Sequence, residues 1–259
     1  MSSLKTKRSA TPRRASPVPP PPSTRVQREC PIVGVGASAG GLEAFTHLLS
    51  QLPVDTGFGF VLVQHLDPQH DSALTQLLTR ATTMPVSEVT NNLRVQANHV
   101  YIIPPNMTLG ITRGVLKLQP RLKSRLAHRS IDFFLEALAR DQRERAVGVI
   151  LSGTATDGTL GLEAIKAEGG LTFAQDESAR YDSMPRSAVA AGCVDFVLSP
   201  ENIARELARI AKHPYIAGRP APSRRGASTP RATIRSCSCS AITAAWISPS
   251  INPPPSTAG

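Results

Sequence analysis

The chain has 259 residues, 41% of them hydrophobic, and a formal net charge of +10. It lacks an apolar run of membrane-spanning length, which predicts a soluble protein with no membrane insertion, and its length predicts one main domain. Residues 1–29 carry a charge of +6 and residues 214–259 carry +5, so residues 30–213 carry −1. A nucleic-acid-binding domain needs a basic face, so we exclude nucleic acid as its partner.

The two ends of the chain differ in composition from its centre. Residues 1–29 and 214–259 are basic and rich in Pro and Ser, which is typical of disorder. We therefore expect two disordered tails around an ordered domain at residues 30–213. The first segment lacks the apolar stretch of a secretory signal. The four cysteines match neither a zinc site nor a disulfide framework, which predicts reduced thiols, a cytoplasmic location and no bound metal.

Between the tails, short apolar runs alternate with helical patterns. Strands are predicted at residues 31–35, 59–63, 99–103, 146–151, 171–174 and 194–198, and helices at 41–51, 71–80, 130–140, 159–168, near 185–191 and at 201–212. A β-hairpin is predicted at 108–112 and 115–118. In the helix at 130–140, we expect Phe133, Phe134 and Leu138 to face inward. This alternation predicts a Rossmann-like, three-layer α/β/α domain with a mostly parallel sheet.

A glycine-lined turn follows the first predicted strand. Gly36-Ala37-Ser38-Ala39-Gly40-Gly41 has the spacing of a nucleophile elbow, in which small residues let the chain turn sharply and leave the serine hydroxyl at a helix N-terminus. The segment also approaches the G-x-G-x-x-G/A pattern of a dinucleotide-binding loop. That reading needs an acidic residue about twenty positions further on, but Asp55 lies there in a loop before the second strand.

Three candidate catalytic residues follow predicted parallel strands: Ser38, His65 and Asp157. Ligands of such sheets bind outside the carboxyl ends of the strands. A serine becomes nucleophilic when a histidine accepts its proton and a carboxylate orients that histidine. Each residue also has a structural alternative. Ser38 could serve the turn or cap a helix, His65 could hydrogen-bond its own loop, and Asp157 could be the N-cap of the helix at 159–168. Their common position favours a triad.

Several segments resemble the chemotaxis protein-glutamate methylesterase (CheB) family. The main ones are Val33-Gly34-Val35-Gly36-Ala37-Ser38-Ala39-Gly40-Gly41, Val63-Gln64-His65 and Leu151-Ser152-Gly153-Thr154-Ala155-Thr156-Asp157-Gly158, with secondary matches at Tyr101-Ile102-Ile103-Pro104-Pro105 and Ser183-Met184-Pro185-Arg186-Ser187-Ala188. The resemblance covers about residues 30–212. It implies that Ser38 is the nucleophile, His65 the general base and Asp157 the orienting carboxylate.

The resemblance also implies the reaction and its partners. Glutamate methyl esters on the cytoplasmic helices of methyl-accepting chemoreceptors would be hydrolysed to release methanol, and particular receptor glutamines would be deamidated. Neither a metal nor another cofactor is needed. We expect the oxyanion and the substrate to meet the backbone at Ala39 and Gly40, assisted by Gly153 and Thr154. The family more often has threonine at position 39 and methionine at position 154, so these two differences affect the shape of the pocket.

The tails bear on regulation and on a second partner. The 29 residues that precede the domain are too few for the receiver domain of typical family members, so we expect no phosphorylation control in cis. The arrangement resembles the first module of methylesterase–methyltransferase fusions, which makes a CheR-type methyltransferase a further expected partner. An out-of-frame reading of residues 237–259 resembles the start of such a methyltransferase. Residues 214–259 are therefore either a disordered extension or a frameshifted remnant.

Two functional hypotheses follow from these observations. In the first, the chain is an active carboxylic-ester hydrolase that acts on receptor methyl-glutamates. In the second, it is a catalytically degenerate methylesterase module that binds receptors or regulates attached domains. Because all three triad positions are retained, the first hypothesis is favoured.

Overall fold

The computed structural model describes residues 30–64, 71–120 and 129–212. The helices are α1 (Gly41–Gln51), α2 (Asp71–Ala81), α3 (Ser130–Gln142), α4 (Thr159–Ala167), α5 (Ser183–Ala190) and α6 (Pro200–Ala211), with a 3-10 helix at Arg143–Arg145. The strands are β1 (Ile32–Ala37), β2 (Gly59–Gln64), β3 (Val86–Glu88), β4 (Leu93–Arg94), β5 (His99–Ile102), β6 (Met107–Thr112), β7 (Val115–Pro120), β8 (Val147–Ile150), β9 (Leu171–Gln175) and β10 (Phe196–Leu198).

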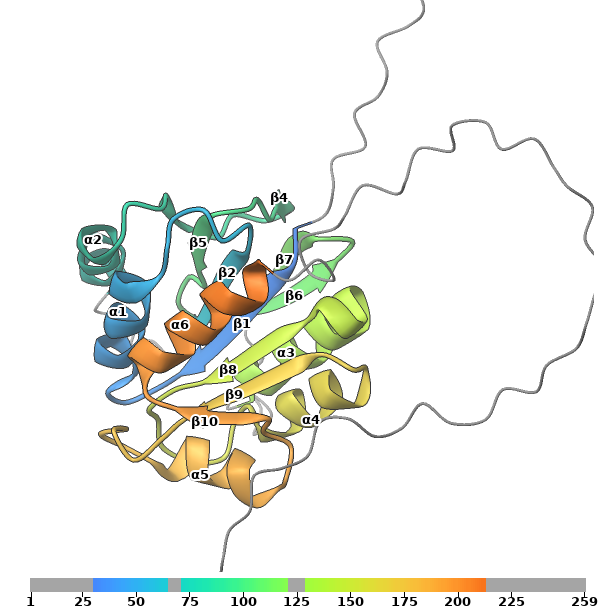
Figure 1. The fold of residues 1–259 in the computed structure, drawn as a ribbon. Helices are drawn as coiled ribbons and strands as arrows, with labels where there is room; N and C mark the ends of the chain where they lie inside the picture. The colour runs from blue at the N-terminus through green and yellow to red at the C-terminus, as the bar shows by residue number, and fades with distance from the viewer. Residues whose placement is uncertain (1–29, 65–70, 121–128, 213–259) are drawn as a thin grey trace, which may run out of the picture. The chain divides into compact units, whose positions relative to one another are not determined.

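A parallel sheet of seven strands forms the centre of the described domain (Figure 1). Its order is β10-β9-β8-β1-β2-β5-β3, and each neighbouring pair is parallel. The chain runs outward from β1 through β2 and then returns to β8 on the other side of β1. Such a change of direction leaves a crevice outside the carboxyl ends of the two central strands. The turn that contains Ser38 begins at this point.

Helices cover both faces of the sheet because the strands are apolar on both faces. Helices α1, α2 and α6 contribute to one core with Phe45, Leu78 and Leu207, whereas α3 and α4 contribute to the other with Phe134 and Ile165. Strands β4, β7 and β6 form a small antiparallel sheet whose apolar side chains join this second core. Figure 1 shows α6 beside α1 on the face opposite α3. No helix in the described ranges combines the length and hydrophobicity needed to cross a membrane.

The predicted fold class is confirmed, and the helix predicted at 41–51 coincides with α1. The small sheet exceeds the predicted hairpin by one strand, β4, and β3 was also not predicted. The expectation for Phe133 was wrong, because its side chain is 40% exposed while Phe134 and Leu138 are buried. Neighbouring residues point about 100° apart around a helix, so the face that buries Phe134 turns Phe133 outward. The predicted tails lie outside the described residues.

Candidate active site

The nucleophile turn depends on two glycines. Gly40 is the N-cap of α1 and has a φ of 71°, and a Cβ built there would lie 2.8 Å from the Oγ of Ser152. A Cβ on Gly41 would lie 2.4 Å from the Cβ of Ala37. Within the turn, the Ser38 N–H donates to the Ser152 carbonyl (3.0 Å) and the Ser38 carbonyl accepts from the Gly41 N–H (2.9 Å). Small residues therefore permit a sharp turn that places Ser38 just beyond β1.

Ser152 joins the nucleophile turn to the loop after β9. Its side chain is 1% exposed, and its Oγ donates to the Ala39 carbonyl (2.9 Å) and accepts from the Tyr181 N–H (3.0 Å). Its own N–H donates to Oε1 of Gln175 (2.9 Å). Ser152 lies within one of the motifs that resemble the family, but nothing in the local sequence pattern distinguishes it from its neighbours. The structure assigns it the task of holding the turn in place.

Gly153 brings the loop after β8 close to Ser38. Its N–H donates to the Tyr181 carbonyl (2.9 Å), and its carbonyl accepts from the Met184 N–H (3.1 Å) and the Ser183 hydroxyl (3.2 Å). A Cβ there would lie 2.2 Å from Met184 Sδ and 3.0 Å from Ser38 Cβ. Gly153 has no Cβ, so its loop can lie close to Ser38 and Met184. Its N–H already donates to the Tyr181 carbonyl and is not directed at an oxyanion. This differs from the expected assistance to an oxyanion.

The start of α1 offers donors for an oxyanion. Among the described residues, no acceptor is found for the N–H groups of Ala39 and Gly40. They belong to the first turn before a helix, where backbone N–H groups and the helix dipole favour negative charge. Thr154, in the neighbouring loop, is exposed. These groups lie in the turn and loop that flank Ser38.

Asp157 is buried in the loop between the neighbouring strand β8 and helix α4, with 4% of its surface exposed. Its Oδ2 accepts from the Ile131 N–H (3.0 Å) and its Oδ1 from the Asp132 N–H (2.9 Å). The alternative that Asp157 caps the helix at 159–168 was therefore wrong in its target. The N-cap of α4 is Gly158, whereas Asp157 caps the start of α3. The structural and catalytic interpretations of Asp157 are thus compatible.

The predicted base, His65, lies outside the described residues. The residue before it, Gln64, ends β2 and pairs with Ala37 in the parallel register. The Gln64 side chain donates from Nε2 to the Ser38 carbonyl (3.4 Å). Within the described domain, Ser38 and Asp157 thus lie in the loops that follow the adjacent strands β1 and β8, and Gln64, the residue before His65, contacts the Ser38 turn.

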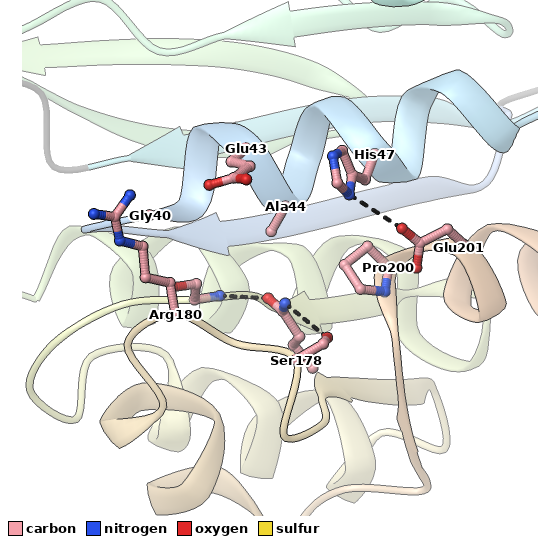
Figure 2. A pocket seen from close by; sticks show the side chains of 10 residues that line it. Gly40, Glu43, Ala44, His47, Ser178, Arg180, Pro200 and Glu201 are labelled. Atoms are coloured by element: carbon pink, nitrogen blue, oxygen red, sulfur yellow. Dashed lines mark hydrogen bonds and ion pairs between the residues drawn. The ribbon is translucent and has the colours of Figure 1, made fainter.

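A cavity of about 360 Å³ opens beside the nucleophile turn. Figure 2 shows Glu43 and His47 along α1 and Glu201 across from them at the start of α6. The His47 Nδ1 lies 3.1 Å from Oε1 of Glu201. The pKa of the Glu201 carboxyl is lowered. The main cause is its hydrogen bond with the Glu201 backbone N–H, and the His47 side chain acts in the same direction. Arg180 borders the cavity near Gly40, so a cation flanks the entrance to the turn.

The arrangement suits acyl transfer. A serine lies near a helix N-terminus beside backbone donors, and a buried carboxylate lies in the loop after the neighbouring strand, and this chemistry uses both groups. In the described part of the chain, no group of three or more His, Cys, Asp or Glu residues is arranged to hold a metal ion.

Comparisons with known proteins match most of the described domain. The family model for CheB methylesterase matches residues 33–207. A protein-glutamate methylesterase/protein-glutamine glutaminase from Burkholderia pseudomallei is 38% identical over 180 residues, which are 68% of this chain and 52% of that protein. A relative from Leptospira interrogans is 34% identical over 178 residues, which are 68% of this chain and 92% of that protein.

The structure is also similar to a solved one. The CheB methylesterase catalytic domain of Thermotoga maritima aligns with a TM-score of 0.65 and 29% sequence identity, covering 70% of this chain and 98% of that domain. The chain thus spans about half the length of the Burkholderia relative and nearly all of the solved domain.

Proposed function

Because this chain belongs to the CheB methylesterase family, we propose that it hydrolyses methyl esters of glutamate side chains on chemoreceptors and releases methanol. The observation that carries this proposal is that the Ser38 turn and the loop with the buried Asp157 follow the adjacent parallel strands β1 and β8. Deamidation of receptor glutamines uses the same groups and is included, because the relative from Burkholderia carries the glutaminase activity in its name.

The first half of the reaction forms an acyl-enzyme. The Ser38 oxygen attacks the ester carbonyl carbon while His65 takes the serine proton. The N–H groups of Ala39 and Gly40, with help from the loop at Thr154, hold the resulting oxyanion. The bond from carbon to the methoxy oxygen then breaks. His65 returns its proton to that oxygen because methoxide is a poor leaving group, and methanol departs.

The second half restores the enzyme. A water molecule gives a proton to His65 and attacks the Ser38 ester, and collapse of the intermediate releases the glutamate carboxylate and reprotonates Ser38. Asp157 keeps the imidazole in the productive tautomer and stabilises the imidazolium. The substrates are the cytoplasmic helices of methyl-accepting chemoreceptors, which places the reaction in the cytoplasm. A CheR-type methyltransferase is the partner that would replace the methyl groups.

The test is methanol release from methylated receptor membranes. Ser38→Ala should reduce kcat by about 10⁴–10⁶-fold and leave the melting temperature close to that of wild type, because the turn accepts a small residue. Ser50→Ala is the matched control. Ser50 is an exposed serine of α1 that bonds only the His47 carbonyl among the described residues, and its loss should not change the rate. Equal methanol release by wild type and Ser38→Ala would refute the nucleophile. No release by wild type would favour a degenerate, receptor-binding module.

A further inference from the structure

Helices α3 and α4 are capped by each other's carboxylates. Asp157, just before α4, accepts the N–H groups of Ile131 and Asp132 at 3.0 and 2.9 Å. Asp132, in the first turn of α3, accepts the N–H groups of Gly158 and Gly161 through Oδ1, both at 2.9 Å. The two side chains are 4% and 3% exposed. The Asp157 carboxylate therefore fixes the start of α3, which carries Asp132. The Asp132 carboxylate fixes the start of α4, which directly follows Asp157 and Gly158.

This exchange is costly for Asp132. Burial raises the pKa of its carboxyl, the Gly161 N–H acts in the opposite direction, and the nearby charge of Asp157 raises the pKa further. The guanidinium of Arg129 lies 3.1 Å from Oδ2 and partly offsets this. Asparagine at this position would avoid two adjacent buried carboxylates and would still place an oxygen at the same point.

The start of α4 fits tightly between its neighbours. Gly158 has a φ of 97°, and a Cβ there would lie 2.3 Å from Cδ1 of Ile150. A Cβ on Gly161 would lie 2.5 Å from the Cβ of Leu135 in α3. The N–H groups that Asp132 accepts are thus presented by backbone that touches the core. A displacement of the Asp132 oxygen must be transmitted to the loop that ends in Asp157.

We propose that Asp132 is a positioning residue for catalysis. It holds the start of α4, and with it the carboxylate of Asp157, in the place from which Asp157 orients the catalytic histidine. The proposal rests on the esterase function proposed above. Asp132 acts through Asp157 and does not contact the substrate, so its variants should change kcat and leave KM unaltered.

Two substitutions separate the position of the acceptor from its charge. Asp132→Asn keeps an oxygen at the same place, and its kcat should stay within about tenfold of wild type. Asp132→Glu keeps the charge but moves it by about 1.5 Å, one carbon–carbon bond, and kcat should fall about 10²-fold. Asp141 is the matched control. It lies at the other end of α3 and accepts the N–H groups of Arg113 and Gly114, so Asp141→Glu should leave kcat unchanged.

The assay is methanol release from methylated receptor membranes at varied receptor concentration, with circular dichroism to confirm folding. If Asp132→Glu does not fold, Asp132→Ser withdraws the acceptor in the opposite direction and replaces it in the comparison. Wild-type kcat in the displaced variant, an equal loss in Asp132→Asn, or an equal loss in Asp141→Glu would each overturn the proposal. Failure of the esterase function itself would appear separately, as full activity of Ser38→Ala.

Discussion

A methyl group added at Gly153 should inactivate the enzyme more than it unfolds it. The new Cβ would lie 2.2 Å from Met184 Sδ, which is fully buried, and 3.0 Å from Ser38 Cβ. Non-bonded heavy atoms prefer about 3.5–4.0 Å, so the overlap with the sulfur is about 1.5 Å. Overpacking of this kind costs about 1–3 kcal/mol, and each kcal/mol lowers Tm by about 2–4 °C in a domain of this size. Displacement of Ser38 by up to 1 Å should reduce kcat by about 10–100-fold.

The same variant is tested by calorimetry and by methanol release. Gly110→Ala is the control, because its Cβ would meet only Phe133 Cε1 at an ordinary 3.7 Å and Lys117 O at 4.0 Å, so stability should stay within about 0.5 kcal/mol. Met184→Ala should cost less stability in the Gly153→Ala background than in wild type, because the added methyl group needs the space of the sulfur. That double variant should still be slow. Wild-type kcat in Gly153→Ala would refute the reasoning.

Four further outcomes are expected. Asp157→Asn should reduce kcat by about 10⁴-fold, and wild-type kcat/KM should rise through about pH 6–7 as His65 loses its proton; a flat profile with an active Asp157→Asn variant would contradict both. Burial raises the pKa of the Asp132 carboxyl in the folded protein. The stabilisation that follows from this shift is present below the unfolded pKa of the group, about 3.9, and is lost as the pH rises through its folded pKa. In denaturant titrations at several pH values, Asp132→Asn should not show this decline in the free energy of unfolding. A decline equal to that of wild type would contradict its assignment to Asp132. Removal of residues 214–259 should leave Tm and esterase rate unaltered, and stop codons in the alternative frame of the coding DNA would end the frameshift hypothesis.

The sequence predicted the centre of the sheet because the strands there, β1, β2 and β8, are buried along nearly their whole length. Every residue of β1 is buried, as expected for a parallel strand covered on both faces, and such a run is visible without a structure. Strand β3 has only three residues, two half-buried and one exposed, so it presents no apolar run. Its place at the sheet edge depends on pairing with β5. Local pattern alone does not indicate that contact.

The site was predictable where chemistry constrains local sequence. Ser38 was predicted because a sharp turn needs small residues on both sides of the serine, and those residues are its immediate neighbours in the sequence. Ser152 was missed because its task is a hydrogen bond to Ala39, 113 residues away. Asp132 was missed for the same reason, since the Gly158 N–H that it accepts is 26 residues distant. Serine and aspartate occur in many surroundings, so residue type alone did not reveal these positions.

Asp157 shows why a structural and a catalytic interpretation of one residue need not compete. A carboxylate has about four acceptor positions, and the N–H groups of Ile131 and Asp132 each use one oxygen. These two bonds fix the plane of the carboxylate, which is what an orienting group for histidine requires. The cap therefore supplies the rigidity on which the proposed catalytic role depends. It follows that Asp157→Asn, which can accept only one of these two N–H groups and can present the wrong donor to the imidazole, should reduce stability as well as kcat.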